Sequence, residues 1–179
     1  MSEVKIVIVG VGNIGIELIK ILNFFECKNI YVNDININNK ILKKYKLKTY
    51  SKEFIYKNSD IITFHIPLNK ETFNLINKKE LNMMNKNTIL VNTSRGEIIN
   101  EKYLFQFLKK KKIHAAALDV FAKEPYFGPL TKLDNCFCTS HIASMSEDCR
   151  NQMELESTKE IIRFFKKDKL RFEIPRYWF

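Results

Sequence analysis

Three of the five glycines in the chain stand together in the segment Gly10-Val11-Gly12-Asn13-Ile14-Gly15. Between a strand and a helix, the first glycine of such a segment permits a tight turn and the second lets the backbone approach a diphosphate. The third lets the helix pack closely on the strand. A diphosphate there lies at the helix N-terminus, where unpaired N–H groups and the helix dipole favour negative charge. Gly10, Gly12 and Gly15 therefore predict the phosphate-binding loop of a dinucleotide site.

An acidic residue, Asp34, follows Gly15 by 19 residues at the end of the next apolar run. A carboxylate at this place accepts hydrogen bonds from the ribose hydroxyls of NAD and repels the 2′-phosphate of NADP, and no Arg lies nearby in the sequence to reverse that preference. We therefore expect NAD as the cofactor. Two alternatives stay open: Asp34 is a solvated residue at the start of a loop, or Lys40, Lys43 and Lys44 favour NADP.

Four later segments concentrate polar side chains after apolar runs. They are His65-Ile66-Pro67-Leu68, Asn92-Thr93-Ser94-Arg95-Gly96, Asp119-Val120-Phe121-Ala122-Lys123-Glu124-Pro125 and Thr139-Ser140-His141-Ile142-Ala143-Ser144. In an open parallel sheet, the carboxyl ends of the strands line the crevice in which ligands bind. The first three segments are expected at strand ends, and Arg95 among them is the only Arg in the first 149 residues.

The apolar pattern of the chain predicts the elements that position these segments. Short apolar runs, typical of strands buried on both faces, cover residues 4–9, 29–33, 61–65, 88–91 and 114–118. A helix is expected from Asn13, and apolar residues at helical spacing form one of its faces: Ile14, Leu18, Ile21, Leu22 and Phe25. Because helices separate the strands, we expect an α/β fold, a Rossmann-like, doubly wound parallel sheet in three layers.

The C-terminal part of the sequence predicts one long helix over residues 144–167, in which Ser144 and Glu147 have capping-box spacing. Without a repeat or a Pro/Gly-rich boundary before it, we expect one NAD-binding domain over residues 1–168 and a C-terminal tail over residues 169–179. The tail contains several large apolar side chains: Phe172, Ile174, Tyr177, Trp178 and Phe179. We expect it to pack on its own domain, on a second copy or on a separate chain.

The composition is that of a folded protein from a reducing compartment. Hydrophobic residues make up 45% and charged residues 28%, and no run reaches the roughly 18 apolar residues of a membrane-spanning helix. The four cysteines lack Cys-x-x-Cys spacing. We expect a cytoplasmic protein without a membrane segment or a metal site. The net charge of +10 and the lysine run at residues 109–112 leave nucleic acid as an alternative partner. This alternative is the weaker one, because the run is expected to end a helix, where the helix dipole favours cations.

Taken in order, the glycine segment and the four later segments resemble the nucleotide-binding domain of the D-isomer-specific 2-hydroxyacid dehydrogenases. This family includes phosphoglycerate dehydrogenase and the glyoxylate/hydroxypyruvate reductases. The resemblance runs from about Lys5 to Phe165. It implies an NAD-dependent oxidoreductase that transfers hydride between a nicotinamide and the C2 atom of a D-2-hydroxy acid or 2-keto acid.

The resemblance also implies three catalytic residues. Arg95 resembles the arginine that anchors the substrate, since a planar guanidinium binds a carboxylate through two parallel N–H bonds and also polarises the neighbouring carbonyl. His141 resembles the proton donor and acceptor, because imidazole titrates in the range that this reaction needs. Glu124 resembles its partner, which fixes the tautomer of the imidazole and raises the His pKa.

For the cofactor, the resemblance implies contacts along the whole dinucleotide. The backbone of Asn13 and Ile14 is expected at the diphosphate and Asp34 at the adenosine ribose, and Asp119 is expected to accept a hydrogen bond from the carboxamide. The remaining expected contacts, two of which also belong to the catalytic set, are His65, Pro67, Thr72, Thr93, Ser94, Arg95, His141 and Ala143. The residues Ser140 and Ser144-Met145 depart from the family's pattern.

Family members are usually longer and carry a second, substrate-facing domain ahead of this one. This chain starts at the nucleotide domain, so we expect the substrate domain to be largely absent. An active enzyme and a catalytically weak or inactive NAD(H)-binding module, such as a sensor, a remnant or half of a two-chain enzyme, both stay open. The resemblance further implies a homodimer, and the missing half raises a separate chain that supplies the substrate domain.

Overall fold

The computed structural model describes residues 3–171 and residue 173. It divides the chain into two compact units, residues 1–140 and residues 141–179. Because the second unit begins at His141, the assignment of residues 1–168 to one domain stays a prediction. The apolar tail residues Phe172, Ile174, Tyr177, Trp178 and Phe179 lie outside the described residues.

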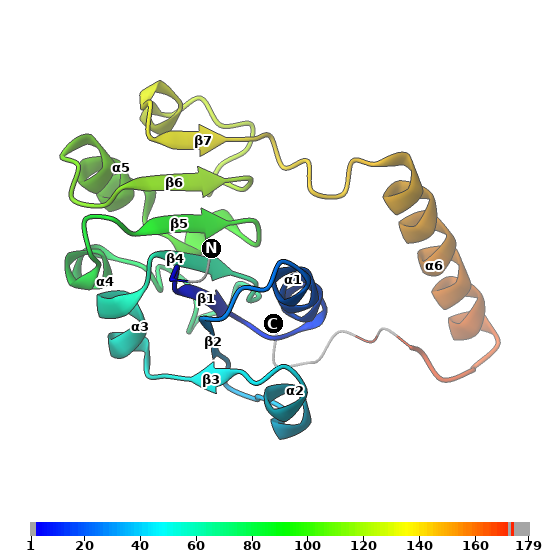
Figure 1. Ribbon diagram of the computed structural model, residues 1–179. Helices are drawn as coiled ribbons and strands as arrows, with labels where there is room; N and C mark the ends of the chain where they lie inside the picture. The colour runs from blue at the N-terminus through cyan, green and yellow to red at the C-terminus, as the bar shows by residue number, and fades with distance from the viewer. Residues whose placement is uncertain (1–2, 172, 174–179) are drawn as a thin grey trace. The chain divides into compact units, whose positions relative to one another are not determined.

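The first unit is built on a seven-stranded, fully parallel sheet with the strand order β3-β2-β1-β4-β5-β6-β7 (Figure 1). The order reverses between β1 and β4, and such a switch point opens a crevice at the carboxyl ends of the two strands. β1 is buried along its whole length, as expected for a strand covered by helices on both faces. The strands are β1 (Ile6–Val9), β2 (Ile30–Asn33), β3 (Lys48–Thr49), β4 (Ile61–Phe64), β5 (Ile89–Asn92), β6 (Ala115–Leu118) and β7 (Cys136–Cys138).

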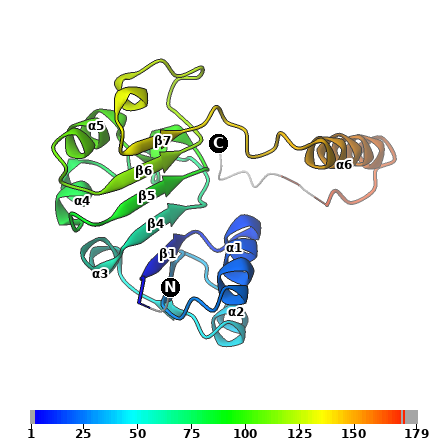
Figure 2. The ribbon, with the colours of Figure 1, turned by 45° about the horizontal axis from the view of Figure 1, so that its top comes forward.

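Helices cover both faces of the sheet and make the three layers that the alternating pattern predicts (Figure 2). On one face, Ile19 of α1 and Ile41 of α2 belong to an apolar cluster with Ile8 of β1. On the other face, α3, α4 and α5 contribute Ile55, Leu81, Leu104 and further residues to a larger cluster. The helices are α1 (Asn13–Phe24), α2 (Asn39–Lys44), α3 (Lys52–Asn58), α4 (Lys78–Met83) and α5 (Glu101–Lys109), with the short 3-10 turns η1 (Gly96–Ile98) and η2 (Pro129–Lys132).

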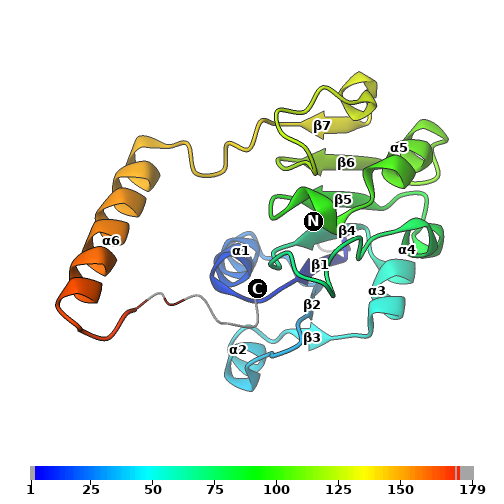
Figure 3. The ribbon, with the colours of Figure 1, turned by 180° about the vertical axis from the view of Figure 1, so that it is seen from behind.

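The five expected strands are all present, and the structure adds one strand at each edge of the sheet, β3 and β7 (Figure 3). These edge strands are two and three residues long, too short to produce a periodic apolar signal. His114 lies just before β6 and is exposed, which corrects the expectation that it begins a buried strand.

The inward face of α1 differs from the expected one. Ile14 and Ile21 are 65% and 52% exposed, whereas Gly15 and Ile19 are the buried residues of the helix. A Cβ on Gly15 would lie 2.2 Å from the Gly10 carbonyl oxygen, so the face that carries Gly15 packs against the sheet. Leu18 and Leu22 of the expected face do pack on the apolar cluster with Ile19, so the expectation is wrong for Ile14 and Ile21 and right for these two residues.

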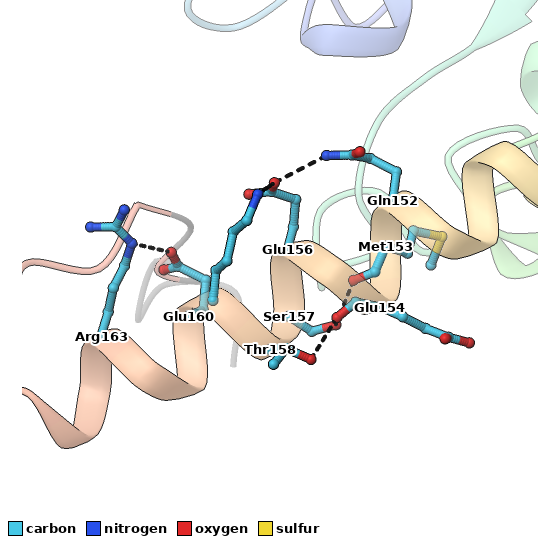
Figure 4. Close-up of polar contacts among 9 residues, drawn as sticks. Gln152, Met153, Glu154, Glu156, Ser157, Thr158, Glu160 and Arg163 are labelled. Carbon is cyan, nitrogen blue, oxygen red and sulfur yellow. Dashed lines mark hydrogen bonds and ion pairs between the residues drawn. The ribbon is translucent and has the colours of Figure 1, made fainter.

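The second unit contains the helix α6 (Glu147–Phe165), which starts later than expected. Its N-cap is Ser146, whose side chain accepts a hydrogen bond from the Cys149 N–H, so the expected capping box of Ser144 and Glu147 is wrong. Polar contacts run along the helix, among them a Gln152–Glu156 hydrogen bond and a Glu160–Arg163 ion pair (Figure 4). In the described part of the chain, no helix is long and apolar enough to span a membrane.

Candidate functional site

The glycine loop joins β1 to α1 at the switch point. Gly10 has φ +96°, and a Cβ there would lie 2.3 Å from the His65 carbonyl oxygen, so this position requires glycine. Gly12 differs, because a Cβ there would meet no described atom within 4 Å. The space beside Gly12 lies at the start of α1, where the first N–H groups, those of Asn13 and Ile14 among them, have no intrahelical acceptor. The loop thus has both the open space and the donors that a diphosphate needs.

Asp34 lies at the carboxyl end of β2 and joins that end to the glycine loop. Its Oδ2 accepts a hydrogen bond from the Val11 N–H at 2.6 Å, and its Oδ1 accepts one from the Asn36 N–H at 2.7 Å. These two bonds orient a half-buried carboxylate next to the loop. A carboxylate has about four lone-pair sites, so further hydrogen bonds from a ribose are compatible with this geometry.

The segment after β4 forms the other wall of the switch point. The His65 N–H donates to the Val9 carbonyl at 2.7 Å, and its Nε2 lies 3.0 Å from the Thr63 Oγ1. Burial lowers the pKa of His65 below its ordinary value. The Thr72 hydroxyl donates to the Pro67 carbonyl at 2.7 Å, so this side chain organises the loop that starts at Pro67.

The loop after β5 presents Arg95, and the buried Asn92 gives that loop its shape. Asn92 donates from Nδ2 to the Arg95 carbonyl at 2.8 Å and accepts from the Ser94 hydroxyl at 2.8 Å. Arg95 itself is exposed, with one guanidinium nitrogen 2.6 Å from the Ser94 carbonyl. Thr93 is exposed as well. The buried Asn92 therefore holds the loop in a shape that leaves the Arg95 guanidinium exposed to solvent.

The loops after β5 and β6 are in direct contact. A Cβ on Gly96 would lie 2.0 Å from the backbone of Phe121, so the two loops can approach this closely only with glycine there. In the second loop, Glu124 accepts a hydrogen bond from the Phe121 N–H at 3.0 Å, and Glu101 of α5 accepts one from the Ala122 N–H at 2.7 Å. Burial raises the pKa of Glu101 above its ordinary value. These contacts bring the Arg95 and Glu124 loops together.

Asp119 is buried directly after β6 and connects three strand ends. Its N–H donates to the Asn92 carbonyl at 3.0 Å, and its Oδ1 accepts a hydrogen bond from the Thr139 hydroxyl at 2.5 Å. Thr139 directly follows β7. The ends of β5, β6 and β7 are thereby held in register at the carboxyl edge of the sheet.

His141 and Ala143 belong to the second unit. His141 has φ +57° and, like Ala143, is exposed. The expected pairing of His141 with Glu124 and its approach to Arg95 stay predictions.

Four residues of this edge were not assigned from the sequence: Asn92, Gly96, Glu101 and Thr139. Three of them stand inside or at the end of the segments singled out, and the Asn-x-Ser-Arg-Gly order was the available signal for Asn92 and Gly96. Glu101 stands on a helix 21 residues before the Ala122 N–H to which it is bonded. A contact of this kind has no local sequence signal.

The lysine run at residues 109–112 lies at the C-terminal end of α5, on the opposite edge of the sheet from the glycine loop. The Lys109 ammonium lies 5.7 Å from the Phe105 ring centroid, and the Lys112 ammonium lies 5.2 Å from that of Phe107. Both ammonium groups thus lie over aromatic rings of α5, and the run begins at the last residue of that helix, as predicted for a helix terminus.

Comparisons with known proteins point to one family. Residues 1–143 match the family described as D-isomer specific 2-hydroxyacid dehydrogenase, NAD binding domain. A glyoxylate reductase of Thermofilum pendens is 36% identical over 168 residues, which are 89% of this chain and 48% of the relative. A D-3-phosphoglycerate dehydrogenase of Archaeoglobus fulgidus is 33% identical over 89% of this chain and 30% of its own length.

Among solved structures, the D-lactate dehydrogenase with NAD+ from Lactobacillus jensenii superposes with a TM-score of 0.85 at 28% identity. The match covers 96% of this chain and 56% of that one. The chain thus spans between about a third and about half of the length of these three proteins.

Proposed function

Because the chain belongs to the D-isomer specific 2-hydroxyacid dehydrogenases and matches their NAD-binding domain, we propose that it supports NAD-dependent reduction of a 2-keto acid. In this reaction, hydride passes between the nicotinamide and the C2 atom, and a D-2-hydroxy acid is the product. The names of the relatives, glyoxylate reductase and D-3-phosphoglycerate dehydrogenase, support a small 2-keto or 2-hydroxy acid as the substrate class.

One observation carries this proposal: the groups that the reaction needs follow the strand ends on a single edge of the sheet. The glycine loop, which has open space for a diphosphate, follows β1, and Asp34 follows β2. Of the residues expected near the nicotinamide and the substrate, His65 follows β4, Arg95 follows β5 and Asp119 follows β6. This is the order that a dinucleotide lying across the switch point requires.

In the proposed reaction, the nicotinamide supplies the hydride and the protein supplies position and charge. One Arg95 N–H is used by the Ser94 carbonyl, and a guanidinium has five donors, so a bidentate pair with the substrate carboxylate is feasible. His141 gives a proton to the carbonyl oxygen of the substrate, and Glu124 orients the imidazole. The Asp119 carboxylate, oriented by Thr139, accepts a hydrogen bond from the carboxamide.

The remaining cofactor contacts follow the same proposal. The Asn13 and Ile14 amides bind the diphosphate, and Asp34 binds the adenosine ribose and favours NAD over NADP. His65 and Pro67 line the dinucleotide. The Thr72 hydroxyl acts by shaping the Pro67 loop, and Thr93, Ser94 and Ala143 lie toward the nicotinamide.

We propose that the protein is cytoplasmic and forms a homodimer. We also propose that a substrate-facing half, in the same polypeptide or on a separate chain, completes the crevice. Such a half would supply N–H donors to the substrate carboxylate and exclude water from the site. A chain that covers about half of its relatives is expected to reduce keto acids poorly by itself.

Binding and turnover together test the proposal. Calorimetry with NADH measures cofactor binding, and the loss of NADH absorbance with glyoxylate, hydroxypyruvate and pyruvate measures reduction. Binding with turnover, even slow turnover, supports the enzyme. Binding without any turnover supports the alternative, an NAD(H)-binding module. A chain that does not bind NADH contradicts both.

A further inference from the structure

A pair of cysteines lies on β7, outside the residues assigned to the cofactor and the substrate. Cys136 and Cys138 are two residues apart on a strand, so their side chains leave the same face, and their Sγ atoms lie 3.7 Å apart. Both are half-buried against the larger apolar cluster, whereas Phe137 between them is 70% exposed. The fold thus brings two thiols into contact in one strand.

We propose that Cys136 and Cys138 form a redox-active dithiol, which a peroxide-class oxidant closes to an intrachain disulfide, and that closure weakens cofactor binding through Thr139 and Asp119. The second part rests on the proposed function, because it takes Asp119 as the residue beside the carboxamide. The first part depends on the two sulfur atoms alone.

The strand geometry makes this disulfide a strained one. Bond formation brings the sulfur atoms from 3.7 Å to about 2.05 Å. In a β-strand, Cα atoms two residues apart are separated by about 6.6 Å, close to the upper limit of about 6.8 Å found for disulfides. Closure therefore shortens β7, and a strained disulfide is easily reduced again. The pair stays reduced in a reducing compartment and closes under oxidative conditions.

The oxidation proceeds in two balanced steps. We write the first step for Cys138, and the same step balances with Cys136 in its place. The Cys138 thiolate attacks one peroxide oxygen, the O–O bond breaks, and hydroxide leaves and is protonated to water, which gives a sulfenic acid. The Cys136 sulfur then attacks the Cys138 sulfur, the S–O bond breaks, and a second water leaves with the Cys136 proton.

The contacts of β7 carry the strain to the proposed nicotinamide site. β7 is the edge strand and is paired with β6, with Cys138 opposite Leu118. The next residue, Thr139, donates from its N–H to the Leu118 carbonyl at 2.9 Å and from its hydroxyl to Asp119 at 2.5 Å. Because β6 is the one described strand that pairs with β7, shortening of β7 displaces Thr139 from both acceptors.

Peroxide treatment of the full chain, followed by peptide mass mapping, tests the dithiol. We expect a Cys136–Cys138 peptide lighter by two hydrogen atoms, which dithiothreitol restores. Cys149→Ser is the matched control, because it removes a thiol of the second unit and is expected to leave the disulfide unchanged. Sulfinic acid at either cysteine, disulfides between chains, or unmodified thiols would overturn the proposal.

NADH calorimetry on the reduced and oxidised forms tests the coupling. We expect the disulfide to raise the Kd for NADH roughly fivefold, as loss of about one hydrogen bond does. Cys136→Ala and Cys138→Ala are expected to show no peroxide effect. The hydrogen-exchange rate of the Thr139 amide measures the coupling in the absence of NADH. We expect this rate to be higher in the disulfide form. An unchanged exchange rate overturns the coupling, whereas reduced protein that does not bind NADH counts against the proposed function alone.

Discussion

The Asp34 carboxylate accepts a hydrogen bond from the Val11 amide at 2.6 Å, which connects the end of β2 to the glycine loop after β1. The proposed ribose contact and the shape of the diphosphate loop therefore depend on one side chain. A change at Asp34 is expected to alter cofactor affinity through both.

Asp34→Ala is expected to weaken NADH binding by about 1.5–3 kcal/mol, because hydrogen bonds to a charged group are lost. It is also expected to reduce the preference for NADH over NADPH, because repulsion of the 2′-phosphate is removed. Calorimetry with both cofactors measures this. Asp60→Ala is the matched control, since Asp60 also accepts a backbone hydrogen bond, from Lys5 at 2.8 Å, but at the other end of the strands. Equal affinity of the parent for NADH and NADPH contradicts the prediction.

Two glycine substitutions are expected to separate folding from binding. Gly10→Ala combines φ +96° with a clash against the His65 backbone and is expected to lower the free energy of unfolding by about 2 kcal/mol or more. Gly12→Ala meets open space, so stability should change by less than about 1 kcal/mol, while NADH affinity falls tenfold or more, about 1.4 kcal/mol. Urea unfolding and calorimetry measure the two effects. If the Gly12→Ala protein binds NADH with the affinity of the parent, the diphosphate does not bind at this loop.

Arg95 and His141 are expected to affect any keto-acid reductase activity differently. Arg95→Lys keeps the charge but loses the bidentate geometry. It should lower kcat/KM by an amount that corresponds to about 2 kcal/mol of lost transition-state stabilisation. His141→Ala removes the proton donor and should lower kcat by about a hundredfold or more. Steady-state kinetics measure both, with Arg150→Lys and His114→Ala as controls at exposed positions. Full activity in both test variants would show that the catalytic assignment is wrong.

His65 is expected to make stability depend on pH. Burial lowers the pKa of His65 in the folded state below its ordinary value of 6.5. Between the two values, the unfolded chain therefore binds more protons than the folded one. Stability therefore rises with pH in this range, and the contribution of His65 is lost as pH falls from about 6.5 through the lower folded-state pKa. Urea unfolding between pH 7 and pH 5 should show this slope, flatter in His65→Gln and retained in the exposed control His114→Gln. The same slope in all three proteins excludes His65 as its source.

The apolar C-terminal residues are expected to support the homodimer. Burial of one aromatic side chain is worth roughly 1.5–3 kcal/mol, so several of them together favour packing on the domain or on a partner. Light scattering should find a dimer for the full chain and weaker association for a chain ending at Lys169. A monomeric full chain, with Trp178 fluorescence typical of a solvated indole, would refute this prediction.

Local patterns predicted the strand ends at which the candidate site residues stand. The Gly10–Gly15 segment and Asp34 are recognisable because their requirements concern the backbone and a short βαβ unit. The contact of Asp34 with Val11 lies within the same unit, because it joins the ends of the paired strands β1 and β2. The edge strands and the cap of α6 were harder to predict, because they depend on two or three residues each.

The sequence by itself determined the class of fold and the place of the glycine loop between a strand and a helix, since periodicity and glycine spacing are local properties of the chain. The tertiary structure decided which groups meet. Gly15 lets α1 approach the end of β1 closely, and Asn92 and Glu101 shape the loops of Arg95 and Glu124. Thr139 reaches Asp119 from the position directly after β7, a strand that was not predicted. These contacts join residues that strand pairing and close packing bring together, and such pairs have no fixed spacing in the sequence.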